Sequence, residues 1–338
     1  LNNLAVIEII EKNFIPARRL LEKVLNIDNA NEIALENIAC INRNRTSYST
    51  AIGNESSVKI DVSIVVATKN RAKLLDEMLT SLKNSAQGVS YEVIVVEGGS
   101  SDDTLEILRK HGINQIYNEL EYFGEGKHSW PQLYNFGFTK AQGKWAMYAS
   151  DDIIFNAGCF SKAVELLDKQ NPEVSGGIFF YKNVITEPGW DRFGIDFTYG
   201  QKLLMNYGLV RLDYFREVNG FDENYKFYCA DGDLCLKFYE KCKQLIPLPG
   251  CFVIHNNVMD NQKKSNLDDS KQDIELYIQR WKHFVTTKMP EPRRLLWNES
   301  GSDNWNLKER NNVVSVKDIR TLISDSNTLD QLRKAGVW

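Results

Sequence analysis

Several features that would assign a chain to a class at once are missing from this sequence. It contains no apolar run close to the roughly 18 to 20 residues that a membrane-spanning helix needs. Its start has no charged segment followed by an apolar core, so a secretory signal is not expected. The G-x-G-x-x-G fingerprint of dinucleotide-binding folds is absent. The net charge of −4 excludes a global basic field, so we expect no nucleic-acid partner.

Cysteine and histidine are scarce, which limits the metal and redox chemistry that the chain can support. The six cysteines form no C-x-x-C pair and are expected to be reduced and mostly buried. Of the four histidines, only His255 ends a predicted strand beside polar residues, where it is either a metal ligand or a structural residue. The chain begins at Leu1, which suggests a processed or truncated protein with a missing upstream part. A cytoplasmic location is the default expectation.

Residues 1–45 are helical in pattern, with apolar residues at helical spacing and a turn near Asn and Asp residues at 26–31. Positions such as Leu21 and Ala34 give this segment a resemblance to a tetratricopeptide repeat, of which about one and a half would be present. It is therefore the tail of a longer solenoid, a helical cap or a plain helical hairpin, and it offers a place for a protein partner. The polar residues 46–60 indicate a linker.

The middle of the chain alternates strand-like and helix-like segments. A β-branched run at 62–67 is typical of a strand buried on both faces, and a polar turn and a helical pattern follow it. A second apolar run at 93–96, a helix at 105–110 and a short strand near 114–118 continue the alternation. This βαβαβ order predicts an α/β fold with a parallel sheet. A later helix is expected to end at Gly143, because glycine often follows a helix end.

Two adjacent carboxylates, Asp151 and Asp152, follow an apolar run at 144–148. In an open parallel sheet, ligands bind just beyond the carboxyl ends of the strands. Two acids at such a place are costly to ionise together without a cation, and hard oxygen ligands favour Mg²⁺ or Mn²⁺. Ser150 and the two acids ahead of an apolar run are also typical of helix capping, so this stretch alone leaves both interpretations open.

Further polar groups stand where other elements begin or end. Glu97 and two glycines close the second strand, where the acid is either an ordinary loop residue or an acceptor for a nucleobase or ribose. Asp231 and Asp233 open a helical segment, where acids gain from the helix dipole with or without a catalytic role. The glycine-bearing residues 123–130 and the aromatic residues 186–200 suit ligand-binding loops better than core elements.

Five segments in order together resemble the family-2 glycosyltransferases of the GT-A fold, over roughly residues 62–256. They are VSIVVATKNR, VIVVEGGSSDDT, YNFGFTKAQGKWAMYASDD, VNGFDENY and ADGDLCLKF. The resemblance implies an α/β domain at 61–256, with a Rossmann-like, mostly parallel central sheet flanked by helices. Residues 61–152 would form its nucleotide-binding half and 153–256 its acceptor half. Helical extensions are expected at the N-terminus and at 257–338.

The resemblance also implies a reaction, in which a sugar moves from a nucleoside-diphosphate sugar to the hydroxyl of a glycan, a protein or another acceptor, with inversion. Mn²⁺ or Mg²⁺ would be held by Asp151, Asp152 or both, with His255 as a third ligand, and the resemblance leaves open which acid binds the metal and which contacts the ribose. Asp231 is the expected general base, with Asp233 as second choice. Trp190 would stack on the acceptor. The remaining expected donor contacts are Thr68, Asn70, Arg71, Glu97, Asn135, Ser150 and Asp151.

Three positions depart from the family pattern. Ala149 replaces the first acid of the usual D-x-D element, Ala230 replaces the Glu before Asp231, and Tyr134 stands where Arg is common. These departures favour an unusual donor or a weakened enzyme. They also keep a second function open, a non-catalytic module that binds a nucleotide sugar or a glycan. The sequence does not identify the donor sugar, its base or the acceptor.

Overall fold

A computed structural model describes most of the middle of the chain and parts of both ends. The described residues are 20–21, 23–25, 27–28, 30–38, 59–184, 192–200, 202–256, 261–283, 293–297, 305–309 and 312–316. Contacts divide the chain into two compact units, Leu1–Lys59 and Ile60–Trp338. The helical prediction holds for the described part of the first unit, where Leu21 and Ala34 are fully buried in a small cluster. Its likeness to a tetratricopeptide repeat stays a prediction.

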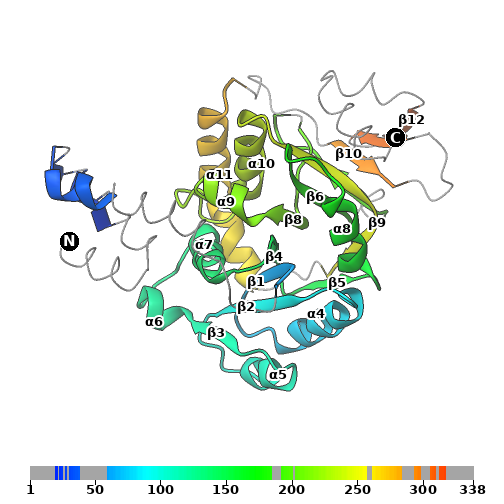
Figure 1. Ribbon diagram of the computed structural model, residues 1–338, viewed down its shortest axis with the longest axis horizontal. Helices are drawn as coiled ribbons and strands as arrows, with labels where there is room; N and C mark the ends of the chain where they lie inside the picture. The colour runs from blue at the N-terminus through cyan, green and yellow to red at the C-terminus, as the bar shows by residue number, and fades with distance from the viewer. Residues whose placement is uncertain are drawn as a thin grey trace. The chain divides into compact units, whose positions relative to one another are not determined.

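The second unit is built on a parallel sheet, as the βαβαβ order predicts. Strand β1 pairs in parallel with β2 and β4, and β2 pairs in parallel with β3. The strands are β1 (Val62–Thr68), β2 (Tyr91–Glu97), β3 (Gln115–Asn118) and β4 (Trp145–Ala149). The helices between them are α4 (Ala72–Ser85), α5 (Thr104–Lys110), α6 (Glu119–Phe123) and α7 (Trp130–Lys140). Figure 1 shows them around the sheet.

Strand β1 lies between β2 and β4, and its side chains are buried on both faces of the sheet. Val65 belongs to one hydrophobic cluster, whereas Ile64 and Val66 belong to the other. Successive side chains of a strand point to opposite faces, so a strand covered on both sides reads as an unbroken apolar run. The run at 62–67 was predicted to be such a strand, and this is confirmed.

The sheet continues with mixed pairing beyond β4. Strand β8 pairs antiparallel with β4 and with β6, and β9 runs parallel to β6. The short β5 pairs antiparallel with β9. These strands are β5 (Ile153–Phe155), β6 (Val174–Asn183), β8 (Gly208–Arg211) and β9 (Gln244–His255), and the helices are α8 (Cys159–Asp168), α9 (Leu212–Glu217) and α10 (Ala230–Glu240).

Of the described residues in the predicted helical C-terminal extension, α11 (Asn261–Arg280) is helical and three other segments are strands. Strand β10 (Arg293–Leu296) pairs antiparallel with β7 (Gly194–Asp196), and β11 (Trp305–Glu309) and β12 (Asn312–Val316) follow in the same sheet. Leu295 and Leu296 are fully buried, so this segment joins the core. The β-branched residues of β12 also favour a strand.

Helix α7 ends at Lys140, before Gly143, and the predicted boundary is corrected accordingly. Ala141 already has an extended backbone with φ −64° and ψ 136°. Gly143 is required for another reason, because a Cβ there would lie 2.7 Å from the backbone nitrogen of Ser63. The glycine therefore permits the close approach of the chain to β1 as it enters β4.

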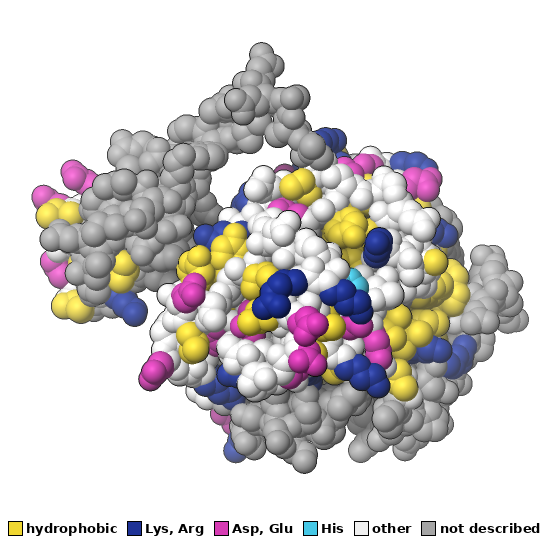
Figure 2. All heavy atoms as spheres, turned by 90° about the horizontal axis from the view of Figure 1, so that it is seen from below, with side chains coloured by type: hydrophobic (Ala, Val, Ile, Leu, Met, Phe, Trp, Pro, Cys, Tyr) yellow, Lys and Arg dark blue, Asp and Glu magenta, His cyan; other side chains and the backbone are white. Residues whose placement is uncertain are grey.

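The charged surface is mixed in sign where Figure 2 shows it, with Lys and Arg side chains beside Asp and Glu. One ion-pair cluster joins α4 to the end of α5, where Asp76 pairs with Lys110 at 2.9 Å and with the ring of His111 at 2.6 Å.

Among the described residues, no helix is long and apolar enough to cross a membrane.

Candidate active site

The carboxyl ends of three parallel strands bring the predicted polar residues together. Thr68 ends β1, Glu97 ends β2, and Asp151 follows β4 by two residues. Because these strands are parallel neighbours, their ends lie at the same edge of the sheet, where α/β folds bind ligands. The sheet therefore brings these three predicted residues to one edge, and their role in binding a ligand stays a prediction.

Asp151 is held by two groups from the β1 end. Thr68 Oγ1 donates to Asp151 Oδ2 at 2.7 Å, and Arg71 Nη1 donates to Oδ1 at 2.7 Å. Only 4% of Asp151 is exposed, and this burial raises its pKa against the opposing effect of Arg71. The ion pair with Arg71 was not predicted, since the sequence suggested only that Arg71 contacts the nucleotide.

Asp152 is buried too, but its environment favours the charged form. Burial raises the pKa of Asp152, and the contact with His255, a hydrogen bond from Ser150 Oγ and the charge of Arg71 outweigh it. The resulting pKa is about 2. Arg71 Nη1 lies 3.3 Å from Oδ2, and His255 Nε2 lies 3.5 Å from Oδ1. Asp152 is therefore an anionic group facing a histidine at neutral pH.

The ring of His255 is oriented by Asn183. His255 Nδ1 lies 2.8 Å from Asn183 Oδ1, and the two residues pair across β9 and β6. An amide oxygen can only accept, so Nδ1 carries the proton and Nε2 presents a lone pair in the neutral ring. A metal-binding histidine commonly has this outer hydrogen bond. Asn183 was not predicted as a site residue, because its only signal in the sequence is a polar residue at the end of an apolar strand.

Asn70 and Glu97 hold the turns after β1 and β2. Asn70 has a left-handed backbone with φ 53°, and its Oδ1 accepts from Ser101 N at 2.7 Å. The Glu97 carboxylate is 1% exposed and accepts from Gly99 N at 3.0 Å and Ser100 N at 2.6 Å. These bonds give both residues a structural role. Their direct contact with a nucleotide stays a prediction.

Asn135 does not have the free amide that direct donor binding requires. Its Nδ2 donates to Phe221 O and to Glu223 Oε1, both at 2.9 Å, and its Oδ1 accepts from Phe221 N at 2.9 Å. The predicted nucleotide contact is therefore corrected to a structural one. Asn135 ties α7 to the segment at 220–223.

Asp231 and Asp233 share the first turn of α10 but have different surroundings. Asp231 is half-buried, and burial raises its pKa to about 6. Asp233 is fully buried, with Trp281 Nε1 at 2.9 Å and Arg280 Nε at 3.1 Å from its Oδ1. Complete burial prevents Asp233 from contacting an acceptor hydroxyl, which corrects the second choice of base. Trp190, the predicted acceptor contact, lies outside the described residues.

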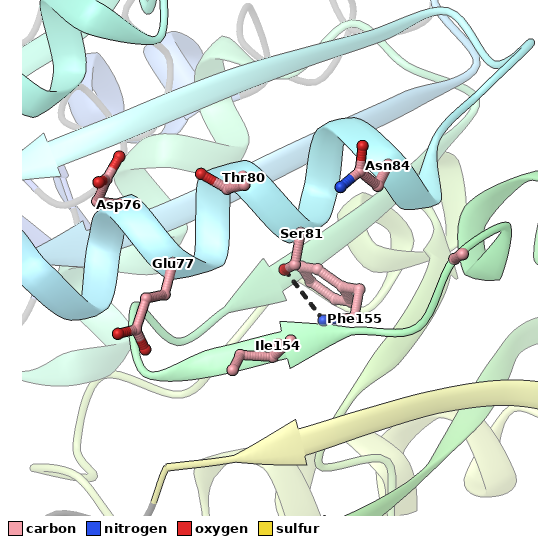
Figure 3. A pocket seen from close by; sticks show the side chains of 8 residues that line it. Asp76, Glu77, Thr80, Ser81, Asn84, Ile154 and Phe155 are labelled. Carbon is pink, nitrogen blue, oxygen red and sulfur yellow. Dashed lines mark hydrogen bonds between the residues drawn. The ribbon is translucent and has the colours of Figure 1, made fainter.

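Among the described residues, a pocket of about 460 Å³ lies between one face of α4 and the strand β5, away from the acidic pair (Figure 3). Asp76, Glu77 and Thr80 line it from the helix. In this pocket, Phe155 N donates a hydrogen bond to Ser81 Oγ at 3.1 Å, so this backbone group of β5 is bonded to α4. Its described lining contains none of the residues predicted for the site, so we do not assign the reaction to it.

Two proteins of known sequence are similar to part of this chain. An uncharacterized glycosyltransferase of Mycoplasma genitalium, MG060, is 27% identical over 113 residues, which cover 32% of this chain and 38% of that protein. The poly(ribitol-phosphate) β-N-acetylglucosaminyltransferase TarS of Staphylococcus aureus is 30% identical over 117 residues, covering 33% of this chain and 20% of TarS. The matched part is therefore well under half the length of either relative.

A solved mannosyltransferase of Pyrobaculum calidifontis shares the fold, with a TM-score of 0.50 and 16% identity over 71% of this chain and 68% of that one. The predicted α/β architecture of the GT-A type is thus confirmed. The model of the family described as glycosyl transferase family 2 matches residues 63–233, just over half of the chain. The match spans β1, the acidic pair and the start of α10, and we conclude that the chain belongs to glycosyltransferase family 2.

Proposed function

We propose that the protein is an inverting, metal-dependent glycosyltransferase that moves a sugar from a nucleoside-diphosphate sugar to an acceptor hydroxyl. The observation that carries the proposal is the cluster of side chains at the carboxyl ends of β1 and β4. There Thr68 and Arg71 each contact Asp151 at 2.7 Å, and Asp152 faces His255 at 3.5 Å. The pKa values of the two acids with proposed roles differ as well. Asp152 has a pKa of about 2 and stays charged, whereas Asp231 has a pKa of about 6. Environments that separate the pKa values of two acids in this way are typical of sites that assign them different roles.

The charged Asp152 and the Nε2 lone pair of His255 fit a divalent cation. Asp152 Oδ1 and His255 Nε2 lie 3.5 Å apart, close enough for one divalent cation to contact both atoms. Among the described residues, no cluster of three His, Cys, Asp or Glu side chains could hold a metal. Mg²⁺ and similar ions commonly use one or two protein ligands and complete their coordination with substrate phosphates and water. When bound, the ion would neutralise the leaving diphosphate as a Lewis acid.

Arg71 and Thr68 prepare the acidic pair for the donor. Arg71 contacts both carboxylates and so offsets their repulsion, and Thr68 fixes one oxygen of Asp151. We assign Asp151 to the ribose side of the donor, with Asn70, Glu97 and Ser150 around the nucleotide. The solved Pyrobaculum calidifontis relative is described in complex with GDP-mannose and Mn²⁺, which supports a nucleotide-sugar donor and a divalent ion.

Asp231 is the proposed general base. Ala230, the residue before Asp231, belongs to the same hydrophobic cluster as Tyr148 on β4, so the start of α10 packs on the side of the strand that leads to the acidic pair. At pH 7 a carboxyl with a pKa near 6 is mostly ionised and still basic enough to accept a proton. The acceptor oxygen attacks C1 of the sugar and its proton passes to Asp231. The bond from C1 to the diphosphate oxygen breaks on the opposite side, which inverts the anomeric carbon.

One observation favours the second candidate, a non-catalytic module that binds a nucleotide sugar or glycan. Ala230 replaces the Glu common in the family, and it is fully buried beside Asp231. Such a module would bind nucleotide without transferring sugar. We favour the enzyme because the base itself, Asp231, is present with a raised pKa.

The N-terminal unit provides a proposed site for a protein partner. Its described residues Ile27, Ile33 and Leu35 are 83%, 59% and 47% exposed. Helical repeats bury such residues against a neighbouring repeat or a bound segment. The proposal is tested by removing residues 1–57, which should abolish partner binding and leave donor binding unchanged.

The direct test of the reaction uses the whole chain with a panel of UDP, GDP, dTDP and CDP sugars, with Mn²⁺ or with EDTA. A glycosyltransferase releases nucleoside diphosphate and sugar, or a glycoside, with one donor class and only with the ion. Asp231→Asn should bind that donor equally well and lose transfer. Nucleotide binding without release of sugar by the wild-type chain would contradict the enzyme and favour the binding module.

A further inference from the structure

Helix α11 lies beyond the family-matched segment, yet it holds the residues that lead to Asp231. The match ends at residue 233, and α11 begins at Asn261. The fully buried carboxylate of Asp273 accepts hydrogen bonds from three consecutive backbone N–H groups, those of residues 226, 227 and 228, at 2.8, 2.8 and 2.7 Å. Hydrogen bonds to a carboxylate are strong, and a buried carboxylate is costly without them. The buried carboxylate of Asp273 therefore holds the backbone of this turn.

The turn leads directly into the helix of the general base. Cys229 has a left-handed backbone with φ 65°, which is uncommon outside glycine, and α10 begins at the next residue. Such a conformation persists where its surroundings hold the chain on both sides. The second anchor comes from α7, where Trp130 N donates to Lys226 O at 2.9 Å. The turn is thus fixed between α7 and α11.

The end of α11 also supports the first turn of α10. The Tyr277 ring lies against Gly232, where an added Cβ would come within 3.2 Å of it. Trp281 and Arg280 both contact Oδ1 of Asp233, at 2.9 and 3.1 Å. Figure 1 shows α11 running alongside α10. Residues on both sides of Asp231 are therefore held by one helix.

We propose that Asp273 is a positioning residue for the general base, because its carboxylate fixes the turn at 226–229 and so aims Asp231 at the acceptor hydroxyl. The inference rests on the proposed function. Asp273 is fully buried, so it acts through the backbone of the turn and not by contact with donor or acceptor. Misplacement of a reacting group by about 1 Å can cost on the order of 100-fold in rate.

The test compares Asp273→Asn with Glu275→Gln, which removes an exposed acid from the same helix. Asp273→Asn keeps the shape of the side chain and removes its charge. We expect kcat to fall by roughly 10- to 100-fold with the Kd of the donor unchanged. Hydrogen exchange of the peptide covering 224–231 should accelerate, whereas Glu275→Gln should match the wild type in both measurements.

A pH profile separates positioning from a general loss of stability. Burial holds the pKa of Asp231 at about 6, which sets the acid limb of kcat/KM. A loosened turn admits water to Asp231, so the limb should move to lower pH in Asp273→Asn. If Asp273→Asn does not fold, Asp273→Glu keeps the charge and displaces the carboxylate by one methylene. The same shift of the limb is expected there, together with a lower kcat.

Two outcomes would overturn the proposal. Wild-type exchange and turnover in the Asp273 variants would show that the turn does not need this carboxylate. A loss of donor binding in proportion to turnover, with an unmoved acid limb, would show a role in overall stability only. If the wild type transfers no sugar from any donor, the proposed function fails. The exchange rates of Asp273→Asn then still decide whether Asp273 holds the turn.

Discussion

His255 Nε2 lies 3.5 Å from Asp152 Oδ1, although the two residues are far apart in the sequence. The short strand β5 produces this contact. It begins at Ile153, directly after Asp152, and pairs antiparallel with β9 so that Ile153 is opposite His255. Asn256 N also donates to Asp152 O at 2.7 Å. The proposed metal site is thus made by the register of one strand pair.

Replacing Asp152 with Asn should remove metal-dependent stabilisation by the donor. Ligand binding to the folded state adds RT ln(1 + [L]/Kd), about 2.7 kcal/mol at a hundredfold excess over Kd. We expect the wild type to show a thermal shift with nucleotide and Mn²⁺ that EDTA removes, and Asp152→Asn to show none. A matched control is Asp168→Asn, an exposed acid elsewhere in the chain. An equal shift in Asp152→Asn would exclude Asp152 as a ligand.

Asn183→Ala should lower the affinity for Mn²⁺, although it removes no metal ligand. Asn183 orients His255 through its Nδ1, and loss of such outer hydrogen bonds typically costs about 10- to 100-fold in metal affinity or activity. Titration of Mn²⁺ at a saturating donor concentration measures the change. The rate at saturating Mn²⁺ should recover toward that of the wild type. A variant with unchanged Mn²⁺ affinity would show that the ring needs no support from Asn183.

The rate should fall in acid because the proposed base must be ionised. With a pKa of about 6 for Asp231, kcat/KM is expected to fall about tenfold per pH unit below pH 6 and to be level near pH 7. Asp231→Asn should lower kcat by about 10²- to 10⁴-fold and flatten this limb. The measurement is initial rate against pH at fixed Mn²⁺. A limb that survives in Asp231→Asn would have to come from another group.

The same raised pKa predicts that Asp231 lowers the stability of the fold at neutral pH. Its pKa is about 6 in the folded state against an ordinary 3.8, so the unfolded chain loses the proton first as the pH rises. The cost is absent below about pH 4, grows between the two pKa values and reaches about 3 kcal/mol at pH 7. Asp231→Asn should therefore be more stable than the wild type at pH 7, and equally stable near pH 3.5 in urea denaturation.

The parallel core and the acidic pair could be predicted because their signals are local. A β-branched run such as 62–67 and two acids after an apolar strand need no knowledge of distant partners. The predictions that were wrong concern residues whose partners lie far away in the sequence. Asn135 matched the family pattern, but its bonds go to a turn more than eighty residues away. Arg293–Leu296 forms a strand between β7 and β11, and its pairing with β7 joins segments that are far apart in the sequence.

Arg294 carries the last prediction, because it joins the C-terminal strands to the catalytic sheet. It is 1% exposed on β10, and its Nη1 donates to Asp196 Oδ1 of β7 at 3.0 Å, while its guanidinium lies 4.2 Å from the centre of the Tyr181 ring. Removing one member of a buried ion pair typically costs about 3 to 5 kcal/mol, since the other charge is left without its partner.

We therefore expect Arg294→Met to lower the free energy of unfolding by about 3 to 5 kcal/mol, as measured by urea denaturation. The control is Arg211→Met, which breaks a more exposed pair with Asp213 and should cost no more than about 1 kcal/mol. Burial raises the pKa of Asp196, and without Arg294 this carboxyl should take up a proton more readily. The deficit of Arg294→Met should therefore shrink as the pH falls. Equal losses in the two variants would mean that β10 adds little to the catalytic unit.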